Sequence, residues 1–178
     1  DYLARLDVAF ANRYLAALRA WSGGGAPPEV WRMLFDLSAG REITAVQLAG
    51  AGVNAHINLD LAVAVVDTGR EMGDATLDTA SRRADYDKVN DVFAEEMDTL
   101  LRRFVEHRAA GGGEETVHQS AVARLLTAVV AVARRHAWED AEELWPLPRR
   151  SDAWKAREAH MDAVACWLGR RLLVDLPG

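Results

Sequence analysis

Hydrophobic residues recur every three or four positions along most of the chain, and no segment alternates strictly between apolar and polar residues as a half-buried strand does. The segments with this spacing are rich in Ala, Leu, Arg and Glu, which favour helices. Glycine runs at 23–25 and 111–113, and the prolines at 146 and 148, separate them. The pattern predicts an all-α bundle of about six helices, over residues 2–21, 28–39, 43–72, 86–109, 116–145 and 151–174.

Three residues predict where helices begin. Pro28 suits the first turn of the second helix. Asp85 precedes the fourth helix, so we expect an N-cap there rather than a catalytic group, and Ser151 is the expected N-cap of the last helix. No linker is long enough to divide the chain, so we expect a single domain over residues 1–178.

The third predicted helix is apolar on nearly every side, whereas a surface helix has one apolar stripe. We therefore expect it to lie at the centre of the bundle. Its apolar run over 45–66 is about long enough to cross a bilayer. Four polar residues that would be costly in lipid interrupt that run: Asn54, His56, Asn58 and Asp60. The run is thus more typical of a buried helix in a soluble protein.

Polar groups inside an apolar helix need a partner, a ligand or a function, because burying one unpaired costs about 1–3 kcal/mol. Asn54 and Asn58 are four residues apart and share a face. His56 and Asp60 share the opposite face, and Asp67 continues it about three turns on. A His–carboxylate pair could bind a divalent metal or transfer protons, and the Asn pair could hold a substrate or a neighbouring helix. The alternative is a buried hydrogen-bond network that fixes how the helices pack.

Further candidate site residues lie on the first and fourth helices. Asp7 falls within the apolar stripe of the first helix. It could serve as a ligand or a base, or it could form an ion pair with Arg5 or Arg13. Tyr86 and Asn90 share the apolar face of the fourth helix, where we expect them to bind substrate.

His136 and Asp140, on the fifth helix, repeat the spacing of His56 and Asp60. If the two pairs met across the bundle core, they could share one divalent metal ion, as the ligands of carboxylate-bridged sites do. The alternative is a His–Asp pair at a helix end. This metal is the one candidate cofactor that the sequence offers.

Composition narrows the class of protein. The net charge of −6 argues against binding to a nucleic-acid backbone, and the single cysteine, Cys166, excludes an internal disulfide framework. No targeting segment is recognisable, so we expect a cytoplasmic protein whose partner is a small molecule rather than nucleic acid or membrane. The first residue is Asp1 rather than Met, which is consistent with an N-terminus truncated upstream. Nothing in the sequence predicts the oligomeric state.

Three segments resemble an actinobacterial all-helical family known only as a domain of unknown function. They are FANRYLAAL at 10–18, GAGVNAHINLDLAVAVV at 50–66 and RRADYDKVND at 82–91. The resemblance implies an all-helical fold and makes specialised metabolism a plausible setting. It places the signature positions of the family at Asn54, His56, Asn58, Asp60, Asp85 and Asn90. His56 and Asp60 also have the HxxxD spacing of the all-helical zinc phospholipases and nucleases, which is an analogy in spacing.

Three hypotheses of function follow. In the first, the chain is a small-molecule enzyme with an acid–base or metal site at His56 and Asp60. In the second, it is a non-catalytic binding or interaction protein whose buried polar network is structural. In the third, it is a divalent-metal hydrolase that also uses His136 and Asp140. A pocket that touches both His56 and Asp60 would favour the first hypothesis over the second.

Overall fold

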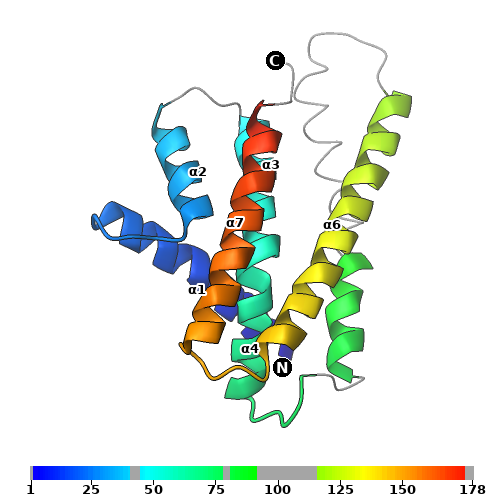
Figure 1. Ribbon diagram of the computed structural model, residues 1–178. Coiled ribbons are helices and arrows are strands. Elements are labelled where there is room, and N and C mark those ends of the chain that lie inside the picture. Colours follow the sequence, from blue (N-terminus) through cyan, green and yellow to red (C-terminus); the bar gives the residue numbers. More distant parts are fainter. Residues whose placement is uncertain (1, 41–44, 78–80, 92–115, 175–178) are drawn as a thin grey trace. The chain divides into compact units, whose positions relative to one another are not determined.

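The computed structural model describes residues 2–40, 45–77, 81–91 and 116–174, and every regular element in these ranges is helical. The elements are α1 (Tyr2–Ser22), α2 (Glu29–Gly40), α3 (Ala45–Ala55), the π-helical turn η1 (His56–Leu61), α4 (Ala62–Glu71), α6 (Thr116–Leu144) and α7 (Asp152–Val174), together with a helical segment over 81–91 (Figure 1). The prediction of an all-α fold is confirmed.

Contacts divide the chain into two compact units. One unit comprises Asp1–Leu77 and His136–Gly178, and therefore contains α1 to α4, α7 and the last turns of α6. The other comprises Asp78–Arg135, with the helical segment over 81–91 and the first part of α6. The expectation of a single domain stays a prediction.

The N-cap prediction for Ser151 is confirmed, and Pro28 lies one residue ahead of the helical turn in which the sequence predicts it. Ser151 caps α7, since its Oγ accepts a hydrogen bond from the backbone N–H of Trp154 at 3.1 Å. Pro28 directly precedes α2, and its carbonyl accepts the first helical hydrogen bond, from the backbone N–H of Arg32.

The N-cap prediction for Asp85 is wrong. The chain is already helical at Ser81, so Asp85 lies inside the helix, where its carboxylate is 3.4 Å from Lys88 Nζ. Arg82, Arg83 and Ala84 are good helix formers, and they extend the helix ahead of the predicted start. The rest of that predicted helix, over 92–109, lies outside the described residues.

The central helix is α3, η1 and α4 joined without a break. The sequence predicts one α-helix over 43–72, and the structure differs by widening it into a π turn at His56–Leu61. Eight consecutive residues, Leu59 to Val66, are buried, and so are Thr68 and Gly69, whereas Asp67 between them is half-buried. Within the described residues, Gln47–Glu71 is long and apolar enough to cross a membrane, but 67% of its most apolar window is buried inside the protein, as in the core helix of a soluble protein.

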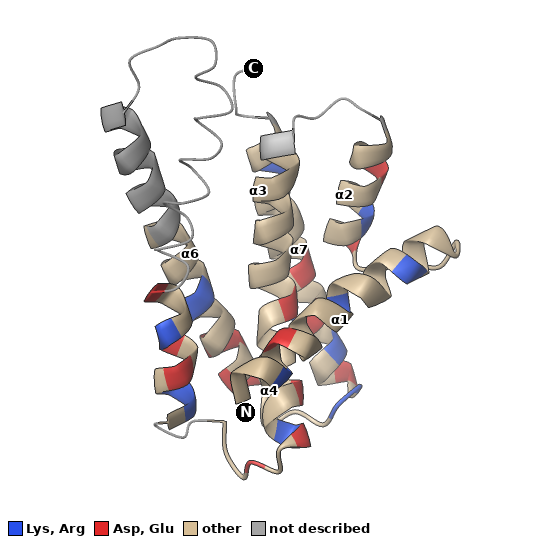
Figure 2. Cartoon of the chain, turned by 180° about the vertical axis from the view of Figure 1, so that it is seen from behind, with Lys and Arg blue, Asp and Glu red and all other residues tan. Residues whose placement is uncertain are grey.

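The neighbours of this central helix set the surroundings of the site. The helix α7 lies along α3 and η1, while α1 packs on α4 and η1, and α2 packs on α7 (Figure 1). Gly69 allows the indole of Trp145 to approach, because a Cβ there would lie 3.0 Å from the ring. The helix α1 carries charged residues of both signs along its length, whereas α3 carries none (Figure 2).

Candidate functional site

Asp60, in the π turn, is the best-buried carboxylate among the described residues, with 1% of its side chain exposed. Its Oδ1 accepts a hydrogen bond from Nε of Arg13 on α1 at 3.0 Å. Its Oδ2 accepts one from Nε1 of Trp31 on α2 at 2.9 Å. A buried charge is tolerated only when it is paired and hydrogen bonded, and Asp60 meets both conditions.

His56 lies beside Asp60, as the spacing predicts. Its Nδ1 is 3.3 Å from Asp60 Oδ2, but the ring is not oriented for a hydrogen bond, so this buried nitrogen has no hydrogen-bond partner among the described residues. Three aromatic rings surround the imidazole: Phe10 at 4.5 Å between centroids, Trp31 at 4.9 Å and Tyr14 at 5.6 Å. The His56 side chain keeps 26% of its surface exposed, so one part of the ring contacts solvent while the rest packs against aromatic rings.

A chain of ion pairs leads away from Asp60. Arg13 Nη2 also binds Glu158 of α7 at 3.3 Å, and Glu158 lies 3.7 Å from Arg149 Nη1. Arg149 Nη2 in turn binds Asp67 of α4 at 2.8 Å. Burial raises the pKa of Asp67 above its usual range, and the positive charges of Arg149 and Arg13 oppose that rise. Two arginines therefore hold three carboxylates, two from the central helix and one from α7.

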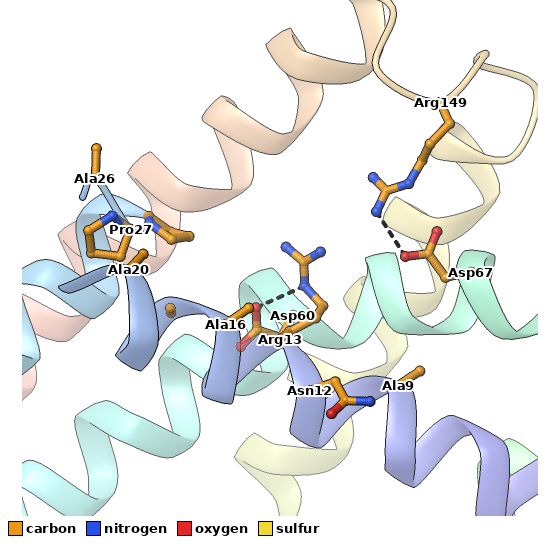
Figure 3. Close-up of a pocket in the computed structure, with 12 residues that line it drawn as sticks. Ala9, Asn12, Arg13, Ala16, Ala20, Ala26, Pro27, Asp60, Asp67 and Arg149 are labelled. Carbon is orange, nitrogen blue, oxygen red and sulfur yellow. Dashed lines mark hydrogen bonds and ion pairs between the residues drawn. The ribbon is translucent and has the colours of Figure 1, made fainter. Parts of the chain in front are cut away.

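A pocket of about 460 Å³ opens on the Arg13 side of Asp60 (Figure 3). One part of its wall is apolar and comes from the alanines of α1 and from the loop before α2, including Pro27. The other part is polar and comes from Asn12, Arg13, Asp60, Asp67 and Arg149. His56 does not line this pocket, so the pocket touches only one member of the predicted pair.

The two asparagines hold a neighbouring helix. Asn58 Nδ2 donates to Asn54 Oδ1 at 2.9 Å, which confirms that they share a face. Asn54 Nδ2 donates to the backbone carbonyl of Ala165 on α7 at 2.7 Å. At this crossing α7 contributes Gly169, where a Cβ would lie 3.3 Å from Asn54 Nδ2. Of the two roles expected for the asparagines, fixing a neighbour is the one that these contacts display.

Asp7 is exposed, so its predicted place in the apolar stripe of α1 is wrong. The two arginines expected to pair with it have other partners: Arg5 binds Glu71 at 2.9 Å, and Arg13 binds Asp60. The stripe is narrower than the sequence indicates, because α1 contacts the bundle mainly along the face that carries Leu6 and Ala17.

Tyr86 and Asn90 belong to the second compact unit, where they hold Arg134. Tyr86 Oη donates to the carbonyl of Arg134 at 2.6 Å, and Arg134 Nη2 donates back to the carbonyl of Tyr86 at 2.8 Å. Arg134 Nε donates to Asn90 Oδ1 at 2.7 Å, and its guanidinium lies over the Tyr86 ring. These contacts give both residues a role in joining the helical segment over 81–91 to α6.

His136 and Asp140 do not join His56 and Asp60. His136 is exposed and its Nδ1 lies 2.9 Å from Glu139. Asp140 is bound by Arg157, and burial raises its pKa against the opposing charge of that arginine. Across the described ranges, no three His, Cys, Asp or Glu residues lie close enough together to hold a metal ion. A metal centre made of the two pairs is therefore not assembled in these ranges.

Sequence reasoning missed the partners of Asp60 as members of the site. Arg13 and Trp31 are 47 and 29 residues away from it along the chain. One indication was available: Arg13 stands between Phe10 and Tyr14 near the apolar stripe of the first helix, and a buried carboxylate requires a cation. The periodicity of one helix does not say which other helix it contacts, so the pairing itself required the fold.

Comparison with known proteins places the chain in a family without assigning it an activity. No curated protein and no solved structure matches the chain. The sequence model of a family of unknown function, DUF5995, matches residues 1–175. This match agrees with the resemblance to an all-helical family without assigned function. Because it covers almost the whole sequence, the chain belongs to the DUF5995 family.

Proposed function

We propose that this protein is a small-molecule enzyme in which His56 and Asp60 act as an acid–base pair. The observation that supports it is the 3.3 Å separation between His56 Nδ1 and the buried Asp60 Oδ2. A carboxylate beside Nδ1 favours the tautomer that carries its proton there, which leaves a lone pair on Nε2 to accept a proton from a substrate. Such contacts are often long without substrate and tighten when it binds.

The surroundings suit this chemistry. Arg13 and Trp31 bind the two oxygens of Asp60, so the carboxylate is fixed and its charge is compensated. Among the described residues none hydrogen bonds to His56 Nε2, which leaves that nitrogen for a ligand. The rings of Phe10 and Tyr14 give the imidazole an apolar wall, as expected for a site that binds an organic molecule.

The proposal also includes the class of ligand, the location in the cell and the metabolic role. The net charge of −6 and the mixture of charges along α1 favour a small organic partner over nucleic acid. A cytoplasmic location and a role in actinobacterial specialised metabolism are further parts of the hypothesis, and they rest on the sequence alone.

A second candidate is a non-catalytic protein in which Asp60 is structural. The observation that favours it is that the pocket touches Asp60 but not His56. Asp60 also joins three elements, since η1 contributes its carboxylate and α1 and α2 contribute its donors. Under this candidate the pair fixes the packing of these helices and transfers no protons.

Nitrogen NMR of the imidazole tests the first candidate without any substrate. We expect the Nδ1–H tautomer for neutral His56, and finding the proton on Nε2 would contradict the assigned role. Turnover is then followed by mass spectrometry on fractions of a bacterial metabolite extract. The wild type and His136→Gln, which alters an exposed histidine, should consume the same compound, whereas His56→Gln should not. Consumption by His56→Gln at the wild-type rate would reject the acid–base role, and consumption by none would favour the non-catalytic candidate.

A further inference from the structure

The pocket beside Arg13 shares Asp60 with the acid–base pair, but His56 does not line it. Its volume of about 460 Å³ falls within the range of small-molecule sites, roughly 300–1,000 Å³. Figure 3 shows Ala20, Ala26 and Pro27 at one end and the side chains of Arg149 and Asp67 at the other. The two ends thus present different chemistry to one ligand.

The charged groups at the polar end are already paired with one another. Two arginines and two aspartates line the pocket, so the formal charge of its wall is zero. Glu158 touches both arginines and adds one more negative charge. A carboxylate on a ligand would meet three protein carboxylates with no unpaired cation. An ammonium group would approach two guanidinium groups, with the nearby carboxylates already engaged.

The groups still open at this end are hydrogen-bond donors. A guanidinium has five N–H groups and no acceptor. Arg13 uses Nε for Asp60 and Nη2 for Glu158, and no described residue accepts from its Nη1. Arg149 uses Nη2 for Asp67 and, within the same described ranges, nothing accepts from its Nε. A ligand that satisfies these donors must supply an acceptor oxygen.

We infer that this pocket binds an uncharged amphiphilic molecule. Its carbonyl-type oxygen accepts hydrogen bonds from Arg13 and Arg149, and its short apolar chain lies against Ala16, Ala20 and Pro27. The pairing of the charged groups selects against ions, the open N–H groups select for an acceptor, and the alanines and prolines select for an apolar chain. This inference does not depend on proton transfer by His56.

Three probes of equal chain length separate the alternatives. Hexanamide, hexanoate and the hexylammonium ion are titrated calorimetrically into the full chain near neutral pH. We expect hexanamide to bind and each ion to bind at least about tenfold more weakly, which is about 1.4 kcal/mol. Equal or tighter binding of either ion would overturn the charge argument. Absence of hexanamide binding would overturn the inference as a whole.

Two matched substitutions locate the bound probe. Ala16→Leu places a larger side chain in the wall of the pocket, whereas Ala11→Leu adds the same side chain at an exposed position of α1 outside the pocket. Both changes keep a residue that favours helix. Hexanamide binding should be lost in Ala16→Leu and retained in Ala11→Leu. Ala26→Leu, in the loop before α2, fills the pocket independently of α1. Undiminished binding in folded Ala16→Leu and Ala26→Leu would place the ligand elsewhere and reject the site.

Discussion

Removal of Arg13 tests how the buried carboxylate of Asp60 is stabilised. Arg13→Met keeps much of the apolar stem and deletes the charge that lies 3.0 Å from Asp60 Oδ1. The hydrogen bond from Trp31 remains, but it carries no charge. Breaking one side of a buried ion pair costs about 3–5 kcal/mol, because the other charge is left uncompensated. That is a large share of the roughly 5–15 kcal/mol that stabilises a typical domain.

A second ion pair on the same helix supplies the control. Arg5 of α1 binds Glu71 of α4 at 2.9 Å, but the two side chains are 52% and 64% exposed. An exposed pair contributes about 0–1 kcal/mol, so Arg5→Met should have little effect. Urea unfolding followed by circular dichroism measures both variants. With a slope of about 2 kcal/mol per molar urea, the midpoint of Arg13→Met should fall by about 1.5–2.5 M.

A double variant separates charge from packing. Arg13→Met combined with Asp60→Leu removes both charges, and replacing a buried ion pair by apolar residues is often close to neutral. We expect this double variant to be more stable than Arg13→Met alone. The reasoning is refuted if Arg13→Met loses no more stability than Arg5→Met, since Asp60 would then not depend on Arg13.

Three further predictions concern single contacts. Trp31→Phe removes the indole donor to Asp60 and should lower the free energy of unfolding by about 1–3 kcal/mol; a change below the error of urea unfolding would contradict this. Ser151→Ala removes the hydroxyl that caps α7 at Trp154 and should cost about 1 kcal/mol, measured in the same way, against little change for Ser151→Asn. Because burial raises the pKa of Asp67, the folded state binds that proton more tightly than the unfolded state. As pH falls from neutral through the raised pKa, the wild type should therefore gain stability relative to Asp67→Asn, and a relative loss would show that the pKa is not raised.

The positions of most helices and the burial of Asp60 can be predicted from the sequence. Apolar spacing locates most helices within a few residues, and a carboxylate inside an all-round apolar segment has to be buried and paired. The four-residue spacing also brings His56 to Asp60 and Asn54 to Asn58. These results are local, since they depend on contacts within one or two turns.

The errors and omissions concern contacts between distant segments. The spacing of Asp7 places it in an apolar stripe, but only the packing of α1 decides how wide the buried face of that helix is. Asp85 resembles an N-cap until the preceding residues are seen to be helical. The roles of Arg13 and Trp31 depend on which helices meet at the π turn, and residue periodicity holds no information about that choice.

The π turn at His56–Leu61 also affects how the length of this chain can vary. One residue added to an ordinary α-helix rotates every later side chain by about 100°. A π turn absorbs such an extra residue locally. In this protein α3 meets α7 before the turn and α4 meets α1 after it. A homologue that lacks one residue in this segment could keep both contacts with an ordinary α-helix, and its imidazole and carboxylate would then meet at a different angle. Insertion or deletion here would therefore alter the candidate site before it altered the bundle.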